Sequence, residues 1–305
     1  MKRLFFYAVM PSLFVVMSLL LSSTVEGAEK ETETPDKPLF DFLNKADWSL
    51  TGRGTIGEMY FKYQEKYPNT DDVKWQDNMP FLGIGGTLSA AFGEDHFVSI
   101  DGYVQQTASG KDSFFGLPEA IDDAILDYNT NLSRRDYAIN LSYGWRNLLI
   151  IDNSLVASVG YKLGKTDING TRRNIVSGEG EGIYYRNEKI QFETKGPTLG
   201  ISYNHPVGES SAVSLNLGYA WLESDYISTQ QEITPASTQG LTYGLSWNST
   251  ITNKLRYGFS VDAYSYTMGA SLTKKEREGV IITNFIDSIE ETVYSFKASL
   301  YYLWD

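Results

Sequence analysis

Residues 213–221 read Val-Ser-Leu-Asn-Leu-Gly-Tyr-Ala-Trp, and residues 241–248 read Leu-Thr-Tyr-Gly-Leu-Ser-Trp-Asn. In both stretches large apolar residues alternate with small or polar ones, which is the two-residue period of a β-strand. One face of such a strand is aliphatic and aromatic, and the other is rich in Ser, Thr, Asn and Gly. We therefore expect strands that separate an apolar surrounding from a polar one.

The same alternation recurs in ten stretches of the chain, which we predict to be strands. They are residues 48–63, 80–92, 96–107, 135–147, 154–165, 188–204, 211–226, 239–251, 254–269 and 289–304. Residues 148–151 fit either the fourth strand or the fifth. In the sixth strand Phe192 is even-numbered but Leu199 is odd-numbered, so we expect a β-bulge at Gly196-Pro197 that restores the apolar face.

The connections between these strands are alternately short and long. Four are tight turns, at 93–95, 152–154, 206–210 and 252–253, and five are long and polar, at 64–79, 108–134, 166–187, 227–238 and 270–288. This rhythm predicts an all-β fold, a closed antiparallel up-and-down transmembrane β-barrel with short periplasmic turns and long extracellular loops. The count is about ten strands, with eight and twelve as the neighbouring even numbers.

A soluble β-sandwich is the main alternative, because its strands alternate as well. Sandwich strands are mostly about 5–6 residues long, whereas these run to about 12–16 and exceed the roughly 9–11 that span a bilayer. Five tryptophans also lie near predicted strand ends, where a barrel has its aromatic girdles: Trp48, Trp145, Trp221, Trp247 and Trp304. These features favour the barrel.

Over essentially the whole segment after residue 28, the sequence resembles a Gram-negative outer-membrane β-barrel protein. The resemblance implies a place in the outer membrane, contact with its lipid and lipopolysaccharide, and recognition by the barrel-assembly machinery. Proteins of this class usually end on an aromatic residue. Tyr302 and Trp304 fit that pattern, but Asp305 follows and displaces the signal by one residue.

The N-terminal residues predict export. Lys2 and Arg3 precede an apolar stretch, and small residues follow near Ala28, so we expect a signal peptide at 1–27. A periplasmic N-terminal tail at 28–47 and the barrel at 48–305 complete the domain organisation. Removing the signal moves the net charge from −12 to about −13, and this acidity argues against nucleic acid as a partner.

The histidines argue against catalysis. Barrel enzymes of the outer membrane resemble one another in relying on a histidine, because a general base near neutral pH usually needs one. The chain has two, His96 and His205, and both fall at predicted periplasmic turns. Residues 52–57 spell a dinucleotide fingerprint, but no helix follows them. We expect no enzyme activity, no catalytic residue, no cofactor and no metal site.

The alternation also predicts which charged residues face the lumen. They are Arg53, Asp101, Lys162, Arg256, Asp262, Glu291 and Lys297. Ten strands leave a narrow interior, so we expect opposite charges to pair and close it. Basic groups at Arg134-Arg135, Arg172-Arg173 and Lys274, Lys275 and Arg277 flank the long connections and could meet lipopolysaccharide phosphates.

Three functional hypotheses follow from these expectations. The first is a non-enzymatic barrel with a narrow lumen that is surface-binding or membrane-organising through its extracellular loops, with an extracellular ligand that the sequence does not identify. The second is a small-solute channel with porin-like transport, in which the inward charges line the path. The third is an outer-membrane hydrolase.

Overall fold

The computed structural model describes most of the chain after the N-terminal segment. The described residues are 46–67, 70–108, 110–111, 114–116, 127–147, 153–176, 182–228, 232–269, 271–277, 280–286 and 288–304. The expected signal peptide, nearly all of the expected tail and residues 148–151 lie outside this set. Within it, no helix is long and apolar enough to cross a membrane.

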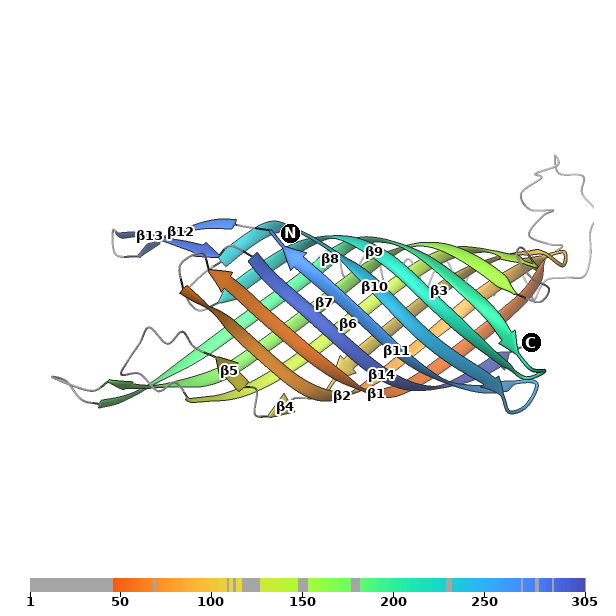
Figure 1. Cartoon of the computed structure of the whole chain (residues 1–305), viewed down its shortest axis with the longest axis horizontal. Coiled ribbons are helices and arrows are strands. Elements are labelled where there is room, and N and C mark those ends of the chain that lie inside the picture. Colours follow the sequence, from red (N-terminus) through yellow and green to blue (C-terminus); the bar gives the residue numbers. More distant parts are fainter. Residues whose placement is uncertain are drawn as a thin grey trace, which may run out of the picture. The chain divides into compact units, whose positions relative to one another are not determined.

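Fourteen strands make up the described segment (Figure 1). They are β1 (Asp47–Tyr67), β2 (Thr70–Phe92), β3 (His96–Thr107), β4 (Gly110–Lys111), β5 (Phe114–Gly116), β6 (Asp127–Arg146), β7 (Ser154–Val176), β8 (Gly182–Val207), β9 (Ser211–Ser228), β10 (Glu232–Thr250), β11 (Leu255–Met268), β12 (Ser271–Arg277), β13 (Val280–Ile286) and β14 (Ser288–Trp304). Apart from the short strands β4, β5, β12 and β13, each corresponds to one predicted strand.

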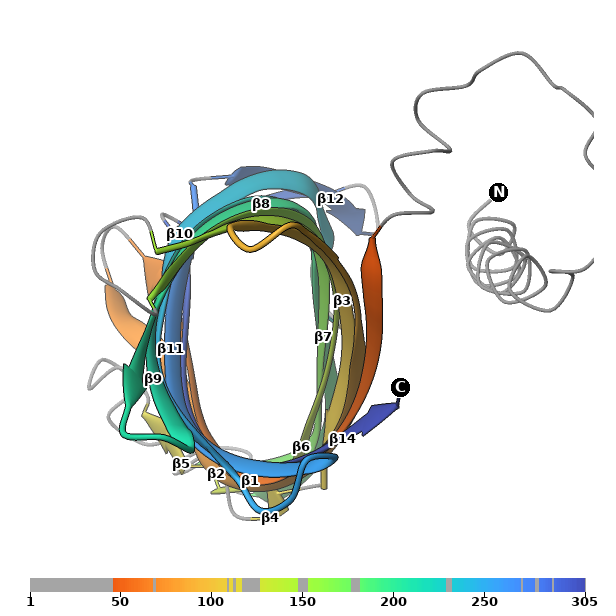
Figure 2. The ribbon, with the colours of Figure 1, turned by 90° about the vertical axis from the view of Figure 1, so that its right-hand side faces the viewer.

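Ten strands form a closed antiparallel barrel, as the sequence predicts. Each pairs with its neighbours along the chain, and β1 closes the ring by pairing with both β2 and β14. Figure 2 shows the ring end-on. Following the paired residues once around from Leu50 returns to β1 at Lys62, so the register shifts by twelve residues. Strand number and shift together fix the tilt and width of a barrel.

Several strands run far beyond the membrane. β8 has 26 residues and β2 has 23, against the roughly 9–11 that a bilayer requires. Much of the sequence expected to form long loops is therefore paired, as in the β7–β8 hairpin, which stays in register from Thr166 to Val176. Outside the membrane both faces of a strand meet water, so polar residues extend a ladder as well as a loop. The tight turns lie at the opposite end of the barrel (Figure 1).

The bulge expected at Gly196-Pro197 is wrong. Both residues pair with β7 in unbroken register, and the β9 pairing resumes at Thr198 without a shift. Phe192 points into the barrel and is 2% exposed, whereas Leu199 points outward and is 47% exposed. The apolar residues change face because the outer half of the lumen is itself apolar. The register shifts that do occur lie in β1 and β10, near Glu65 and Ile233.

An apolar belt surrounds the barrel on its outside. Each strand contributes at least one large outward residue, and ten of them are between 44% and 72% exposed: Ile56, Ile84, Ile100, Leu141, Val159, Leu199, Leu217, Leu245, Phe259 and Phe296. Aromatic pairs border the belt. Tyr143–Trp145 and Tyr302–Trp304 lie toward the short turns, and Tyr219–Trp221 lies toward the long hairpins. A closed exposed belt of this kind requires a lipid surrounding.

Leu217 gives a test of this belt, because it lies in its middle, between Ile201 and Tyr243. We expect Leu217→Arg to lower the free energy of unfolding by about 2–4 kcal/mol, the cost of a cation at the bilayer midplane. Ser237→Arg, on the exposed rim of β10, should cost about 0–1 kcal/mol. Denaturant unfolding of the vesicle-inserted barrel measures both, and equal effects would contradict the assignment of the belt.

Candidate functional site

The inward residues divide the lumen into two halves. In the half toward the long hairpins they are large and buried, and they form one apolar cluster. Its members are Met59, Phe61, Tyr63, Met79, Phe81, Leu132, Ile168, Ile190, Phe192, Ala220, Leu222, Tyr226, Tyr264, Tyr266, Met268, Ile289 and Val293. Toward the short turns the inward residues are smaller, more polar and partly exposed.

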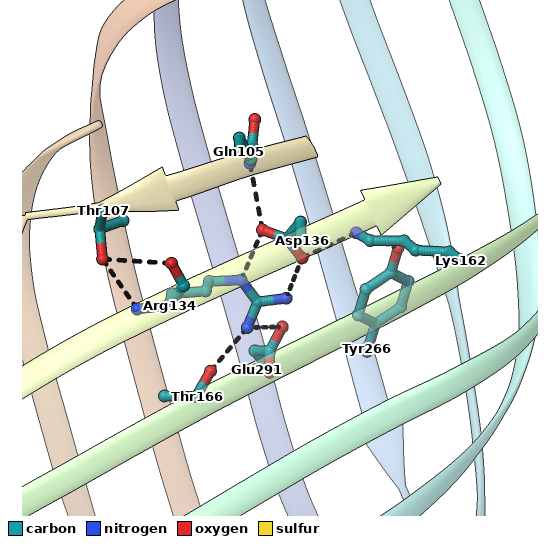
Figure 3. Close-up of polar contacts among 8 residues, drawn as sticks. All are labelled: Gln105, Thr107, Arg134, Asp136, Lys162, Thr166, Tyr266 and Glu291. Carbon is teal, nitrogen blue, oxygen red and sulfur yellow. Dashed lines mark hydrogen bonds and ion pairs between the residues drawn. The ribbon is translucent and has the colours of Figure 1, made fainter. Parts of the chain in front are cut away.

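A buried ion-pair network lies within the apolar cluster (Figure 3). Arg134 and Asp136 are two residues apart on β6, so both face inward. The guanidinium of Arg134 donates two hydrogen bonds to Asp136, from Nη2 to Oδ1 at 2.8 Å and from Nε to Oδ2 at 2.9 Å. Its Nη1 lies 2.9 Å from Glu291 Oε1 on β14 and donates to Thr166 Oγ1 at 2.8 Å. All three charged side chains are only 1% exposed.

Lys162 on β7 completes the network. Its Nζ lies 3.8 Å from Asp136 Oδ1 and donates to the Tyr266 hydroxyl at 3.2 Å. The same ammonium lies 3.7 Å from the centre of the Tyr264 ring, a cation–π geometry. Two cations and two carboxylates balance in a region without water, which is the condition under which charges can be buried.

The ends of the network are tied to neighbouring strands. Gln105 Nε2 donates to Asp136 Oδ2 at 3.1 Å, and Thr107 Oγ1 accepts the backbone N–H of Arg134 at 2.7 Å. Both come from the outer end of β3. The network, the apolar cluster and these two residues, which we call the plug, join β3, β6, β7, β11 and β14 across the lumen. Such cross-links stiffen the barrel wall and occupy its interior.

Gly164 shows how closely the plug is packed. A Cβ at this position would lie 2.8 Å from Arg134 Nη2, 2.8 Å from Thr194 Oγ1 and 3.1 Å from Asp136 Oδ1. The network therefore occupies the space that a side chain on β7 would take. A glycine is required here by the approach of its neighbours and not by its backbone conformation.

The lumen residues expected from the sequence are placed in two groups. Lys162 and Glu291 belong to the plug. Toward the short turns, Arg53 Nη2 lies 3.9 Å from Asp101 Oδ2, and Lys297 Nζ lies 3.0 Å from Asp262 Oδ2. These four side chains are 21–27% exposed, so water reaches this half of the lumen. Arg256 is exposed near the β10–β11 turn.

The residue at the centre of the plug was misplaced by the sequence analysis. Arg134 was grouped with Arg135 at the membrane surface, but it is buried and only Arg135 is exposed. The predicted strand began at 135, one residue too late. Its outward residues Tyr137 and Ile139 are odd-numbered, so extending the alternation by one position would have placed Arg134 and Asp136 inside.

Both histidines lie at the short-turn end, as predicted. His96 is the first residue of β3, and its Nδ1 lies 3.1 Å from the Tyr143 hydroxyl. His205 lies near the end of β8 and stacks on Tyr203, with ring centroids 6.3 Å apart. Gly52 and Gly54 lie inside β1, so the apparent dinucleotide fingerprint is part of a strand. In the described part of the chain, no cluster of three potential metal ligands occurs.

Comparison with known proteins supports the class. No family model matches the sequence. No curated protein matches it either. Among solved structures, the fold is similar to the outer membrane protease OmpT of Escherichia coli, with a TM-score of 0.58, 14% identity, and coverage of 90% of this chain and 99% of OmpT. The chain is a Gram-negative outer-membrane β-barrel protein.

Two further outer-membrane barrels are more distant. The translocator domain of the autotransporter NalP from Neisseria meningitidis has a TM-score of 0.38 and 10% identity, with 87% of this chain and 92% of that chain covered. The attachment invasion locus protein Ail of Yersinia pestis has a TM-score of 0.29 and 12% identity, with 84% and 99% covered. At these identities the likeness concerns the fold alone.

The plug makes a prediction about stability with a neighbouring control. Arg134→Gln should lower the free energy of unfolding by about 3–5 kcal/mol, because it leaves buried carboxylates without their counter-charge. Arg135→Gln, on the exposed face of the same strand, should change it by less than about 0.5 kcal/mol. Denaturant titration in a zwitterionic detergent compares the two, and similar losses would contradict the structural role of the network.

Proposed function

We propose that this protein is a non-enzymatic outer-membrane barrel that does not conduct solutes and acts through its long outer hairpins as a surface-binding or membrane-organising protein. The observation that carries the proposal is the plug. Phe61, Met79 and Val293 are 0% exposed although they point into the lumen. Side chains from facing strands meet there and leave no water path along the axis.

The outer hairpins supply the surface for this function. β7 and β8 stay paired from Ile168 and Ile190 in the plug to Val176 and Gly182 at the hairpin end. β12 and β13 form a two-stranded sheet of their own, outside the barrel sheet. A barrel that served only as a membrane anchor would not need ladders of this length. We infer that they hold contact surfaces away from the membrane.

A small-solute channel is the second candidate, and one observation favours it. The half of the lumen toward the short turns is open to water and carries the Arg53–Asp101 and Lys297–Asp262 pairs. Charges of both signs along a wet wall are typical of a channel. In the proposed function this half is a vestibule that ends blindly at the plug.

Conductance separates these two candidates. Reconstituted into a planar bilayer, the wild-type barrel should show no steady conductance. Combined replacement of three plug residues, Phe61→Ser, Phe192→Ser and Tyr266→Ser, should produce ion-conducting steps because it removes bulk from the closed section. Phe259→Ser, which changes a ring on the lipid-facing side, is the matched control and should stay silent. Reproducible ion-selective steps in the wild type would overturn the closed-lumen proposal and support the channel.

The hydrolase hypothesis rests on chemistry that the outer half of the lumen lacks among its described residues. Both histidines lie at the short turns, while the carboxylates Asp136 and Glu291 are enclosed in the plug. We expect no peptidase or lipase activity from the folded barrel. Assays with a fluorogenic peptide library and a phospholipid substrate check this. Turnover that survives His96→Ala and His205→Ala would show that the histidine argument fails and that a carboxylate mechanism operates.

A further inference from the structure

The outward face of β6 and β7 changes character abruptly at one level. From the short turns upward, the directly paired outward residues are Leu141 with Val159, Ile139 with Tyr161, Tyr137 with Leu163, and then Arg135 with Lys165. Three apolar or aromatic rows thus end at a row of two cations. Because tyrosines mark the membrane interface, the cation row lies at the level of the lipid headgroups.

Arg135 and Lys165 are an unfavourable pair on their own. Residues directly opposite in an antiparallel pair have Cβ atoms about 4.5–5.5 Å apart, and like charges there repel. Lys165 Nζ has one acidic neighbour, Glu193 Oε1 on β8 at 2.8 Å. Arg135 is exposed and has no acidic partner among the described residues. An anion between the two side chains would relieve the repulsion.

A third cation lies beside them. Lys195 on β8 is paired in register with Leu163 and is 44% exposed. Strand tilt raises it to about the depth of Arg135 and Lys165. Its Nζ lies 3.7 Å from Asp225 Oδ2, which leaves further N–H donors available. On β10 and β11, outward rim positions of the same zone hold the uncharged pair Gln239 and Thr267, so the cations mark one side of the barrel.

We propose that Arg135, Lys165 and Lys195 bind a phosphate of a phosphorylated glycolipid in the outer leaflet. The guanidinium offers paired donors that match phosphate oxygens, and the two ammonium groups add point charges. Tyr161, Leu163 and Tyr137 lie directly below and contact the acyl chains of the same lipid. The site extends the membrane-organising part of the proposed function, but it requires only a barrel in the membrane and not a closed lumen.

The test uses the folded barrel in zwitterionic detergent, with lipid A as the probe and native mass spectrometry as the readout. Wild-type protein should retain lipid A, and the double variant Arg135→Gln/Lys165→Gln should bind it at least about tenfold more weakly, because charge-assisted contacts are lost. The matched control is Lys62→Gln/Lys66→Gln on β1, which removes the same charge from another side of the rim. It should stay within about twofold of wild type.

Two further arms identify the source of the phosphate. Dephosphorylated lipid A should bind the wild type as weakly as lipid A binds the double variant, and millimolar inorganic phosphate should not displace lipid A. Equal binding by wild type and double variant, an equal loss in the control, or full retention of the dephosphorylated lipid would each overturn the site. Displacement by inorganic phosphate would overturn the lipid as its ligand. Heat-modifiable migration verifies folding in every variant, and conductance of the wild type would bear only on the closed lumen.

Discussion

Ring closure is the constraint on which the rest of the structure depends. Once β1 pairs with both β2 and β14, strand number and register shift fix the width of the lumen. At this width, large inward side chains from opposite walls come into contact. The lumen can then be filled without any inserted loop or helix. Side chains alone form the plug, and the balance of two cations with two carboxylates allows charged groups to take part in it.

The fold could be predicted from the sequence because alternation and turn spacing are local signals. Strands such as β9 and β11 have clear parity, and tight turns such as 93–95 leave little freedom in pairing. The outer strand ends could not be found in this way. Beyond the membrane, both faces of β7 and β8 meet water, so the alternation that marks a lipid-facing strand disappears while the hydrogen-bonded ladder continues.

The plug was only partly predictable, for a related physical reason. The rule that apolar residues face lipid holds in the half of the barrel toward the short turns, where the lumen is wet. In the outer half the interior is apolar too, so Ile190 and Phe192 follow the inward parity and mimic a slipped strand. Parity carried correct information about Lys162 and Glu291, whereas composition misled the placement of Arg134. The position of a residue on its strand was more reliable than its chemical type.

Arg134 and Arg135 show how one strand serves the interior and the membrane at once. Adjacent residues on β6 point to opposite faces, so one arginine is held by Asp136 and Glu291 while its neighbour lies among lipid headgroups. A slip of β6 by one residue would exchange them. It would turn Asp136 toward lipid and place Tyr137 among the plug charges. Both environments reject that arrangement, so the ion-pair network fixes the register of β6 and thereby holds Arg135 at the headgroup level.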